Sequence, residues 1–315
     1  MTPSTDAAVE KAVAEAPSAI VGVAEPTGLR IRWFRRLLRN RSVVVGAAIF
    51  LVFLLAALFA GQISTHVPTR LNPPQRLKPP SAANFLGTDE FGRDVYSLVV
   101  HGSRVSLLVG GVTMLITSIG GTLIGLIAGY YRRLDLVVMR FMDGLMAFPA
   151  IILAIAFMAA RGPGVWNVIL ALSLVYLPRT ALLVRSTVLS LRELDYVAAA
   201  RALGRRDLAV AVRHILPNCL APLLVQGTFI FAHAVLAEAI LGFLGVGVPP
   251  YVPSWGNVIA SGKNVIREAF WVSLFPGITL TVAGLSLNLL GDGLRDTLDP
   301  RLRGSVGTGT GRQGA

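Results

Sequence analysis

Long apolar stretches that are almost free of charge recur along this chain. A helix needs about 20 mostly apolar residues to cross roughly 30 Å of hydrocarbon. The pattern predicts six such helices, at residues 43–63, 105–131, 144–160, 162–178, 217–237 and 270–290. The third and fourth stretches are short, so their helices are expected to extend past the flanking Asp143, Arg179 and Arg185. The sequence therefore predicts an all-α integral membrane protein with six transmembrane helices.

Composition points in the same direction. Of the 315 residues, 54% are apolar and 15% are charged, whereas soluble domains have roughly 45–50% apolar and about 25% charged residues. These values exclude an ordinary cytoplasmic enzyme and a disordered regulator.

The formal net charge of +12 would suggest a nucleic-acid partner in a soluble protein, but in a membrane protein it indicates cytoplasmic loops. When the spans are laid out alternately with the N-terminus inside, most of the 29 Lys and Arg residues fall on the inner side. We therefore expect a multi-pass protein of the cell inner (plasma) membrane, in contact with lipid and not with nucleic acid, with both termini in the cytoplasm.

The same patterns divide the chain into segments. An Ala/Pro/Thr-rich composition predicts a disordered cytoplasmic tail at the N-terminus, and a Gly-rich composition predicts a flexible tail at the C-terminus. The predicted order is a tail at 1–28, a basic flank and first span at 29–64, an extracytoplasmic loop at 65–104, a membrane core with five further spans at 105–303 and a tail at 304–315. Within the core, residues 190–217 form a long cytoplasmic loop.

No pattern of residues indicates catalysis. Cys219 is the single cysteine, and its apolar surroundings suggest a packing role. The four histidines, His66, His101, His214 and His233, lie on separate segments without metal-ligand spacing. The glycine-rich segments at 242–247 and 256–263 fail the spacing of nucleotide-binding loops, and the one at 309–314 has the dinucleotide spacing but no helix to follow it. We expect no catalytic residue, no metal site and no cofactor bound by this chain.

The second predicted span carries small residues at i, i+4 spacing: Thr117, Gly121, Gly125 and Gly129. Because lipid supplies no hydrophobic drive between helices, small residues that allow close backbone approach favour their association. This row predicts a helix-packing face. The alternative is that glycine is simply common in membrane helices.

The 195–217 segment predicts two short helices around a break. Tyr196, Ala199, Ala200 and Leu203 would share one apolar stripe on the first helix. Gly204 would then end that helix in a left-handed conformation, and Asp207 would cap the next helix.

The second helix of that segment again has apolar residues on one face: Leu208, Ala211, Val212 and Ile215. Pro217 would mark the place where it gives way to the fifth span. Small alanines at the centre would let the backbone of another protein come close. The alternative is a loop that lies on the membrane surface, which its arginines would also favour.

This segment resembles the "EAA" signature of ABC importer permeases, which reads Glu-Ala-Ala, three residues, Gly, nine residues, Ile-x-Leu-Pro. The matching residues are Ala199, Ala200, Gly204, Leu216 and Pro217. Ala198 stands where Glu is usual and His214 where Ile is usual. The first departure weakens any charged contact there, and the second resembles the His-Ile-Leu-Pro-Asn form, at 214–218, of the peptide-importer branch.

Further blocks at 86–95, 243–247, 253–256 and 289–300 resemble dipeptide and oligopeptide permeases, specifically the C-type subunit with six spans. The resemblance extends from about residue 30 to residue 303 and implies the type I ABC importer permease fold. It implies a function in importing peptides, although relatives with such blocks also carry glutathione-like thiols or nickel chelates.

The resemblance also implies partners. A sister permease would complete a heterodimeric pathway, two ABC ATPases would bind ATP and Mg, and an extracytoplasmic substrate-binding protein would deliver substrate. The ATPases would receive the coupling loop in a surface groove. The residues of this chain implied in that contact are Tyr196, Ala198, Ala199, Ala200, Leu203, Gly204, Asp207, His214, Leu216 and Pro217.

Glu238 is a carboxylate at the end of the fifth predicted span, and such residues are functional candidates because charge near hydrocarbon is costly. It could line a translocation cavity or gate together with Phe243 and Gly245, or it could anchor the turn at 242–247. A rival function is an ion-coupled secondary transporter or channel that uses Glu238.

The predicted outer loop contains Asp89, Arg93 and Asp94 among glycines. These residues are candidates for contact with a substrate-loaded receptor protein, or for a cap over the cavity. The alternative is a solvated loop without a partner.

Overall fold

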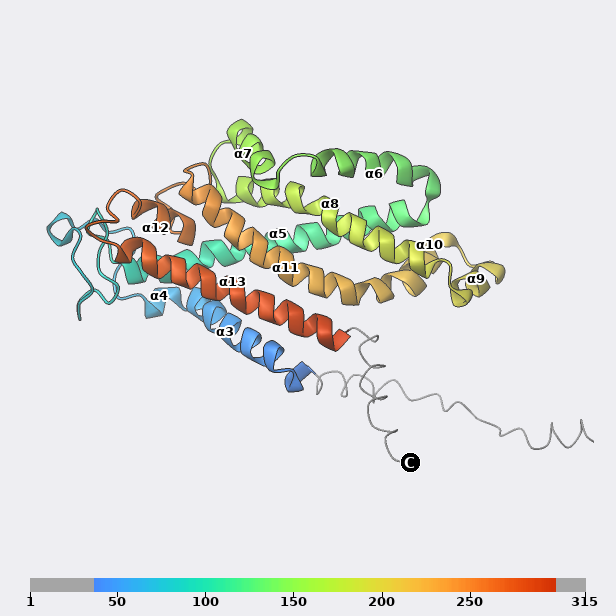
Figure 1. The fold of residues 1–315 in the computed structure, drawn as a ribbon, viewed down its shortest axis with the longest axis horizontal. Coiled ribbons are helices and arrows are strands. Elements are labelled where there is room, and N and C mark those ends of the chain that lie inside the picture. Colours follow the sequence, from blue (N-terminus) through green and yellow to red (C-terminus); the bar gives the residue numbers. More distant parts are fainter. Residues whose placement is uncertain (1–36, 299–315) are drawn as a thin grey trace, which may run out of the picture. The chain divides into compact units, whose positions relative to one another are not determined.

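A computed structural model describes residues 37–298. The tails predicted at 1–28 and 304–315 lie outside these residues. Within the described residues the regular secondary structure is helical, with no strand beyond one isolated bridge between Thr88 and Asp94, so the all-α prediction is confirmed. The α-helices are α3 (Arg41–Leu58), α4 (Ala60–Ile63), α5 (Val95–Tyr130), α6 (Arg132–Met146), α7 (Ala150–Arg161), α8 (Val165–Leu191), α9 (Asp195–Ala202), α10 (Asp207–Val210), α11 (Leu216–Phe243), α12 (Trp255–Ser261) and α13 (Trp271–Leu298) (Figure 1).

Five of these helical stretches are long and apolar enough to cross a membrane, with α10 and α11 counted as one. The third predicted span, 144–160, falls on the end of α6 and on α7, and these two helices pass the same test together as a pair bent by 90°. The prediction of a continuous helix over 144–160 is therefore wrong. Pro149 lies at the break and caps α7, because proline lacks an N–H and pushes the preceding residue out of the helical region.

Two other helix boundaries can be compared with the prediction. Helix α5 begins at Val95, so residues 95–104 are helical and do not belong to a loop; the Asp94 side chain accepts from the Ser97 N–H and starts this helix. Helix α8 continues through Pro178 to Leu191, which confirms that this helix extends past Arg179 and Arg185. Proline is tolerated inside membrane helices, and Pro178 is buried within α8.

The glycine row on α5 packs against α8. A Cβ atom built on Gly121 would lie 2.5 Å from the Thr180 Cβ, and one built on Gly125 would lie 2.5 Å from the Ala181 carbonyl oxygen. At Gly129 the nearest atom would be the Val188 Cβ at 2.7 Å. No larger residue fits at these three positions, and the predicted packing role of the row is confirmed.

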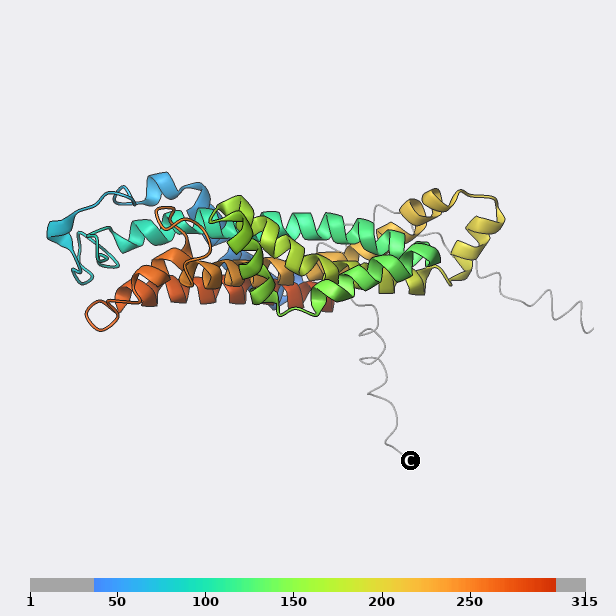
Figure 2. The ribbon, with the colours of Figure 1, turned by 90° about the horizontal axis from the view of Figure 1, so that it is seen from above.

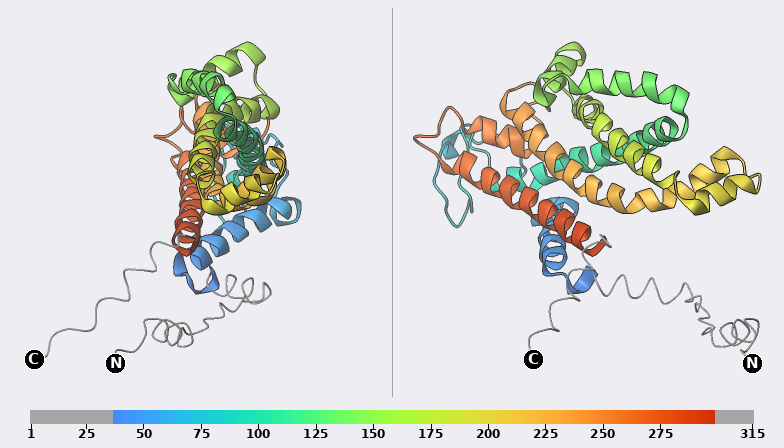
Figure 3. Two further views of the ribbon diagram at one scale, coloured as in Figure 1. Left: turned by 90° about the vertical axis from the view of Figure 1, so that its right-hand side faces the viewer. Right: turned by 45° about the vertical axis from the view of Figure 1, so that its right-hand side comes forward.

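Helix α11 packs on both α5 and α13, and α3 packs along α13 (Figure 3). The short α12 lies among α5, α11 and α13, with Trp255 fully buried and its indole N–H donating to the Val99 carbonyl at 3.0 Å. The short helices α9 and α10 lie at one end of the long membrane helices, whereas α4 and α12 lie toward the other end (Figure 2).

Candidate functional site

The 195–217 segment is the first candidate site, and its first helix, α9, has two different faces. Val197 and Ala200 are buried, in a cluster with residues of α8 and α11. Tyr196, Ala199 and Leu203 are exposed, with Leu203 84% exposed. The predicted single stripe is therefore wrong in one respect, because Ala200 faces inward and the other three residues face outward. Ala198 is exposed beside them.

The break after α9 is only partly as predicted. Gly204 has a φ of 74°, which confirms the left-handed conformation. The prediction that Asp207 caps the second helix is wrong: Arg206 occupies that position without a side-chain hydrogen bond. The Asp207 carboxylate instead accepts a hydrogen bond from the Tyr130 hydroxyl, at 2.6 Å. Tyr130 is the last residue of α5. It lies far from Asp207 in the sequence, so residue spacing within the 195–217 segment could not predict this contact.

The second helix runs into the fifth span without a break. Helix α10 continues through a π-helical turn, Ala211–Ile215, directly into α11. Pro217 lies in the first turn of α11, directly after the π-helical turn, so the fifth span does begin at this proline as predicted, although the helical backbone is not interrupted there. His214 and Leu216 are half-buried and Pro217 is exposed along this join.

Several contacts fasten the segment to the membrane helices. The Arg201 guanidinium lies over the Tyr130 ring, 5.2 Å from its centroid. Arg192 donates to the Gly129 carbonyl at 3.1 Å, and Ile215 is fully buried. The segment is thus an ordered extension of α5, α8 and α11 that exposes apolar residues, including Leu208, which is 68% exposed.

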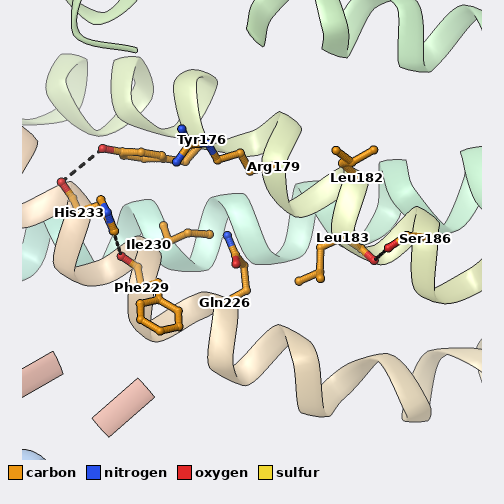
Figure 4. Close-up of a pocket in the computed structure, with 9 residues that line it drawn as sticks. All are labelled: Tyr176, Arg179, Leu182, Leu183, Ser186, Gln226, Phe229, Ile230 and His233. Atoms are coloured by element: carbon orange, nitrogen blue, oxygen red, sulfur yellow. Dashed lines mark hydrogen bonds between the residues drawn. The ribbon is translucent and has the colours of Figure 1, made fainter. Parts of the chain in front are cut away.

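A second candidate site is a pocket between α8 and α11, called the α8–α11 pocket below (Figure 4). Its volume is about 490 Å³. The lining combines polar and apolar side chains: Tyr176, Arg179, Leu182, Leu183, Ser186, Gln226, Phe229, Ile230 and His233.

The polar residues of this pocket differ in their hydrogen bonding. The Tyr176 hydroxyl donates to the His233 carbonyl at 3.3 Å, and His233 Nδ1 lies 2.7 Å from the Phe229 carbonyl. Arg179 is exposed in the pocket and forms no ion pair within residues 37–298.

Sequence reasoning missed the α8–α11 pocket. The charge pattern counts Arg179 among the inner-side arginines that follow the apolar core of the fourth span, and it favours a structural role for His233. The signal that could have found the pocket is the presence of Arg179, Gln226 and His233 inside long apolar helices.

Glu238 has no surface that could line a pathway. Its side chain is fully buried, and its Oε2 accepts a hydrogen bond from the Ser106 hydroxyl at 2.8 Å. The Trp255 N–H donates to the same Ser106 oxygen at 3.2 Å. The cavity-lining interpretation is therefore wrong. Glu238 does hold helices together, but through Ser106, which links α11 to α5 and α12, and not by a hydrogen bond to the turn at 242–247.

Phe243 and Gly245 lie at the exposed end of α11. The Lys263 ammonium lies over the Phe243 ring at 5.2 Å from its centroid, and Gly245 has a φ of 76° in the turn that follows. Their role in a pathway or gate stays a prediction.

The three candidate receptor-contact residues form hydrogen bonds inside the outer segment. The Asp89 carboxylate accepts from the Arg93 backbone N–H at 2.8 Å and from Arg93 Nε at 2.6 Å. Asp94 accepts from Thr65 and Asn84, each at 3.0 Å. Both carboxylates are buried, so the surface available to a partner comes from other residues of this segment.

In the described part of the chain, no group of three or more His, Cys, Asp or Glu side chains could hold a metal ion. The two candidate sites are therefore the 195–217 segment, which exposes apolar residues, and the α8–α11 pocket, which has polar side chains.

Residues 121–304 match the family described as "binding-protein-dependent transport system inner membrane component". Residues 29–80 match the N-terminal TM domain of oligopeptide transport permease C. The chain belongs to this permease family. The permease is therefore a multi-span protein of the inner membrane, as its sequence blocks predicted.

Curated relatives cover most of this permease. A putative peptide transport system permease protein of Brucella abortus is 51% identical over 85% of this chain and 91% of the relative. The di/tripeptide transport system permease protein DppC of Pseudomonas aeruginosa is 40% identical over 94% of this chain and 99% of the relative. An ion-coupled mechanism finds no support among these matches.

The fold of this permease is also similar to a solved structure. The MetNI methionine ABC transporter in inward-facing conformations aligns with a TM-score of 0.52 and 19% sequence identity, over 64% of this chain and 96% of that chain. This likeness shows that the permease has the type I ABC importer fold.

Proposed function

We propose that this permease is the C-type subunit of an ATP-driven importer for di- or oligopeptides. A sister permease completes the translocation pathway as a heterodimer, and an extracytoplasmic binding protein delivers the substrate. The names of the relatives support a peptide substrate, since both the Brucella and the Pseudomonas proteins are described as peptide transport permeases.

Two separate ABC ATPases bind ATP and Mg and grip the 195–217 segment from the cytoplasm, the side on which both chain termini lie. The observation that carries this proposal is the exposure of Leu203 and Leu208 on an otherwise ordered segment. Large apolar residues exposed together and rimmed by polar groups are typical of protein interaction sites. Arg201, Arg205 and Arg206 supply such a rim.

The contacts of the segment indicate how motion would pass to the membrane. Helix α10 joins α11 through a continuous helical backbone, and Asp207 is bonded to Tyr130 at the end of α5. A displacement of the segment by the ATPases would therefore move two membrane helices together. In this mechanism the chain transmits work, while its ATPase partners break the phosphate bond.

Substitution of Ala199 tests the ATPase contact. Ala199 is exposed on α9, so Ala199→Arg leaves the packing of the permease intact but places a long cation where a partner backbone would approach. We expect the ATPases to be lost from the complex purified through the permease, measured as subunit stoichiometry. Ala199→Ser is the matched control and should retain them. Wild-type stoichiometry in the Arg variant would refute the contact.

A further inference from the structure

The α8–α11 pocket lies within the membrane-spanning length of both helices. The Gly164 N–H donates to the Gly247 carbonyl at 3.3 Å, so the first residue of α8 and the end of α11 lie at the same end of the molecule. At 1.5 Å per residue, Arg179 lies about 21 Å along α8 from Val165. From Phe243, His233 lies about 15 Å along α11 and Gln226 about 25 Å. All three therefore lie within about 30 Å of that end of their helices, a length similar to the thickness of the hydrocarbon.

An arginine at this depth cannot face lipid at low cost. Intramembrane charges almost always face a bundle interior or a water-filled cavity, and they pair with an opposite charge or mark a substrate pathway. Of the neighbouring acids, Asp135 pairs with Arg185 and Glu238 is bonded to Ser106. No carboxylate of the described chain neutralises Arg179.

The side chains around Arg179 suit a small peptide. Hydrogen-bonding side chains of Tyr176, Gln226 and His233 line the pocket. The side chains of Leu183 and Ile230 give it apolar surface (Figure 4). The volume of about 490 Å³ falls within the 300–1,000 Å³ of typical small-molecule sites. A guanidinium offers a planar fork of N–H donors that matches the two oxygens of a carboxylate.

We propose that Arg179 binds the C-terminal carboxylate of a peptide in transit and that the α8–α11 pocket is a substrate subsite. This inference rests on the proposed function and names the group of the substrate that is recognised. A free peptide always carries this carboxylate whatever its side chains, so one arginine serves many sequences. A single charged contact on an exposed arginine is weak enough for release, as transport requires.

The test uses the whole importer reconstituted in vesicles, with its receptor saturated by a dipeptide or by the C-terminal amide of the same dipeptide. Receptor binding of each ligand is measured first. Uptake is then expressed per ATP hydrolysed for wild type, Arg179→Gln and Arg179→Lys. Arg161→Gln, which removes an exposed arginine at the end of α7 outside the pocket, is the matched control.

We expect Arg179→Gln to lower uptake of the free dipeptide about tenfold, the size of one lost charge-assisted contact. Uptake of the amide should not change. Arg179→Lys keeps the positive charge but lacks the planar fork of donors, so its uptake of the free dipeptide should lie between those of wild type and Arg179→Gln. Arg161→Gln should match wild type.

Three results would overturn the inference. The first is wild-type uptake of the free dipeptide by Arg179→Gln. The second is an equal loss for dipeptide and amide. The third is loss of the sister permease from the purified Arg179→Gln complex, which would show that Arg179 pairs with an acid of that subunit. Absence of ATP-dependent peptide uptake by the unaltered complex would instead overturn the proposed function itself.

Discussion

Ser106 joins three helices through one hydroxyl group. It donates to Glu238 on α11 and accepts the N–H of Trp255 at the start of α12. A buried polar group that loses its partner costs about 1–3 kcal/mol, so this junction stabilises the end of the helices where α12 packs. The sequence could single out Glu238 as an acid in an apolar span. It could not supply the partner, which lies 132 positions away.

The role of Glu238 can be tested by removing its charge alone. Glu238→Gln keeps an oxygen that can accept from Ser106, so we expect uptake within about twofold of wild type. Glu238→Ala leaves Ser106 without its acceptor and should lower the stability by about 1–3 kcal/mol, seen as a lower temperature of thermal unfolding in detergent. Abolished uptake in a folded Gln variant would mean that the carboxylate carries charge during transport.

At the scale of helices, the sequence predicted well which stretches are apolar enough to cross a membrane, but it predicted poorly where a helix is broken. Pro149 interrupts a predicted helix, whereas Pro178 lies inside one that continues for thirteen more residues, to Leu191. Hydropathy does not distinguish these two prolines, because the outcome depends on which neighbours satisfy the freed carbonyl groups. The glycine row of α5 was predictable because its residues are close together in the sequence. The sequence did not show that the row packs against α8.

The short helices of the 195–217 segment depend on the backbone at Gly204. Its φ is 74°, and a Cβ atom there would meet nothing within 4 Å. Gly204→Val therefore tests backbone conformation without a steric clash, at a cost of about 1–2 kcal/mol or more for a β-branched residue. We expect ATP hydrolysis to continue while uptake per ATP falls at least severalfold, measured in the same vesicles. Gly204→Asn tolerates this conformation and should behave as wild type; equal uptake by the Val variant would contradict a rigid coupling role.

At the scale of the whole molecule, the sequence and the structure agree on which segments lie at opposite ends. The basic residues predicted an inner side that includes 195–217 and an outer side that includes 65–104. The structure places α9 at the opposite end of the helices from the segment that joins α4 to α5 (Figure 1). The α8–α11 pocket could not be predicted because it needs the pairing of two spans about 50 residues apart. Periodicity within one span says nothing about that pairing.

The orientation of these two ends can be tested with single cysteines. The native Cys219 is fully buried, so it should contribute little background when a membrane-impermeant maleimide is applied to folded protein. Leu203→Cys and Leu71→Cys place thiols at residues that are well exposed, one at each end. In right-side-out vesicles we expect labelling of Leu71→Cys alone, and in inverted vesicles of Leu203→Cys alone. Bound ATPases should also shield Leu203→Cys until they are stripped from the membrane. Labelling of Leu203→Cys from the outside would reverse the orientation and remove the cytoplasmic ATPase contact with it.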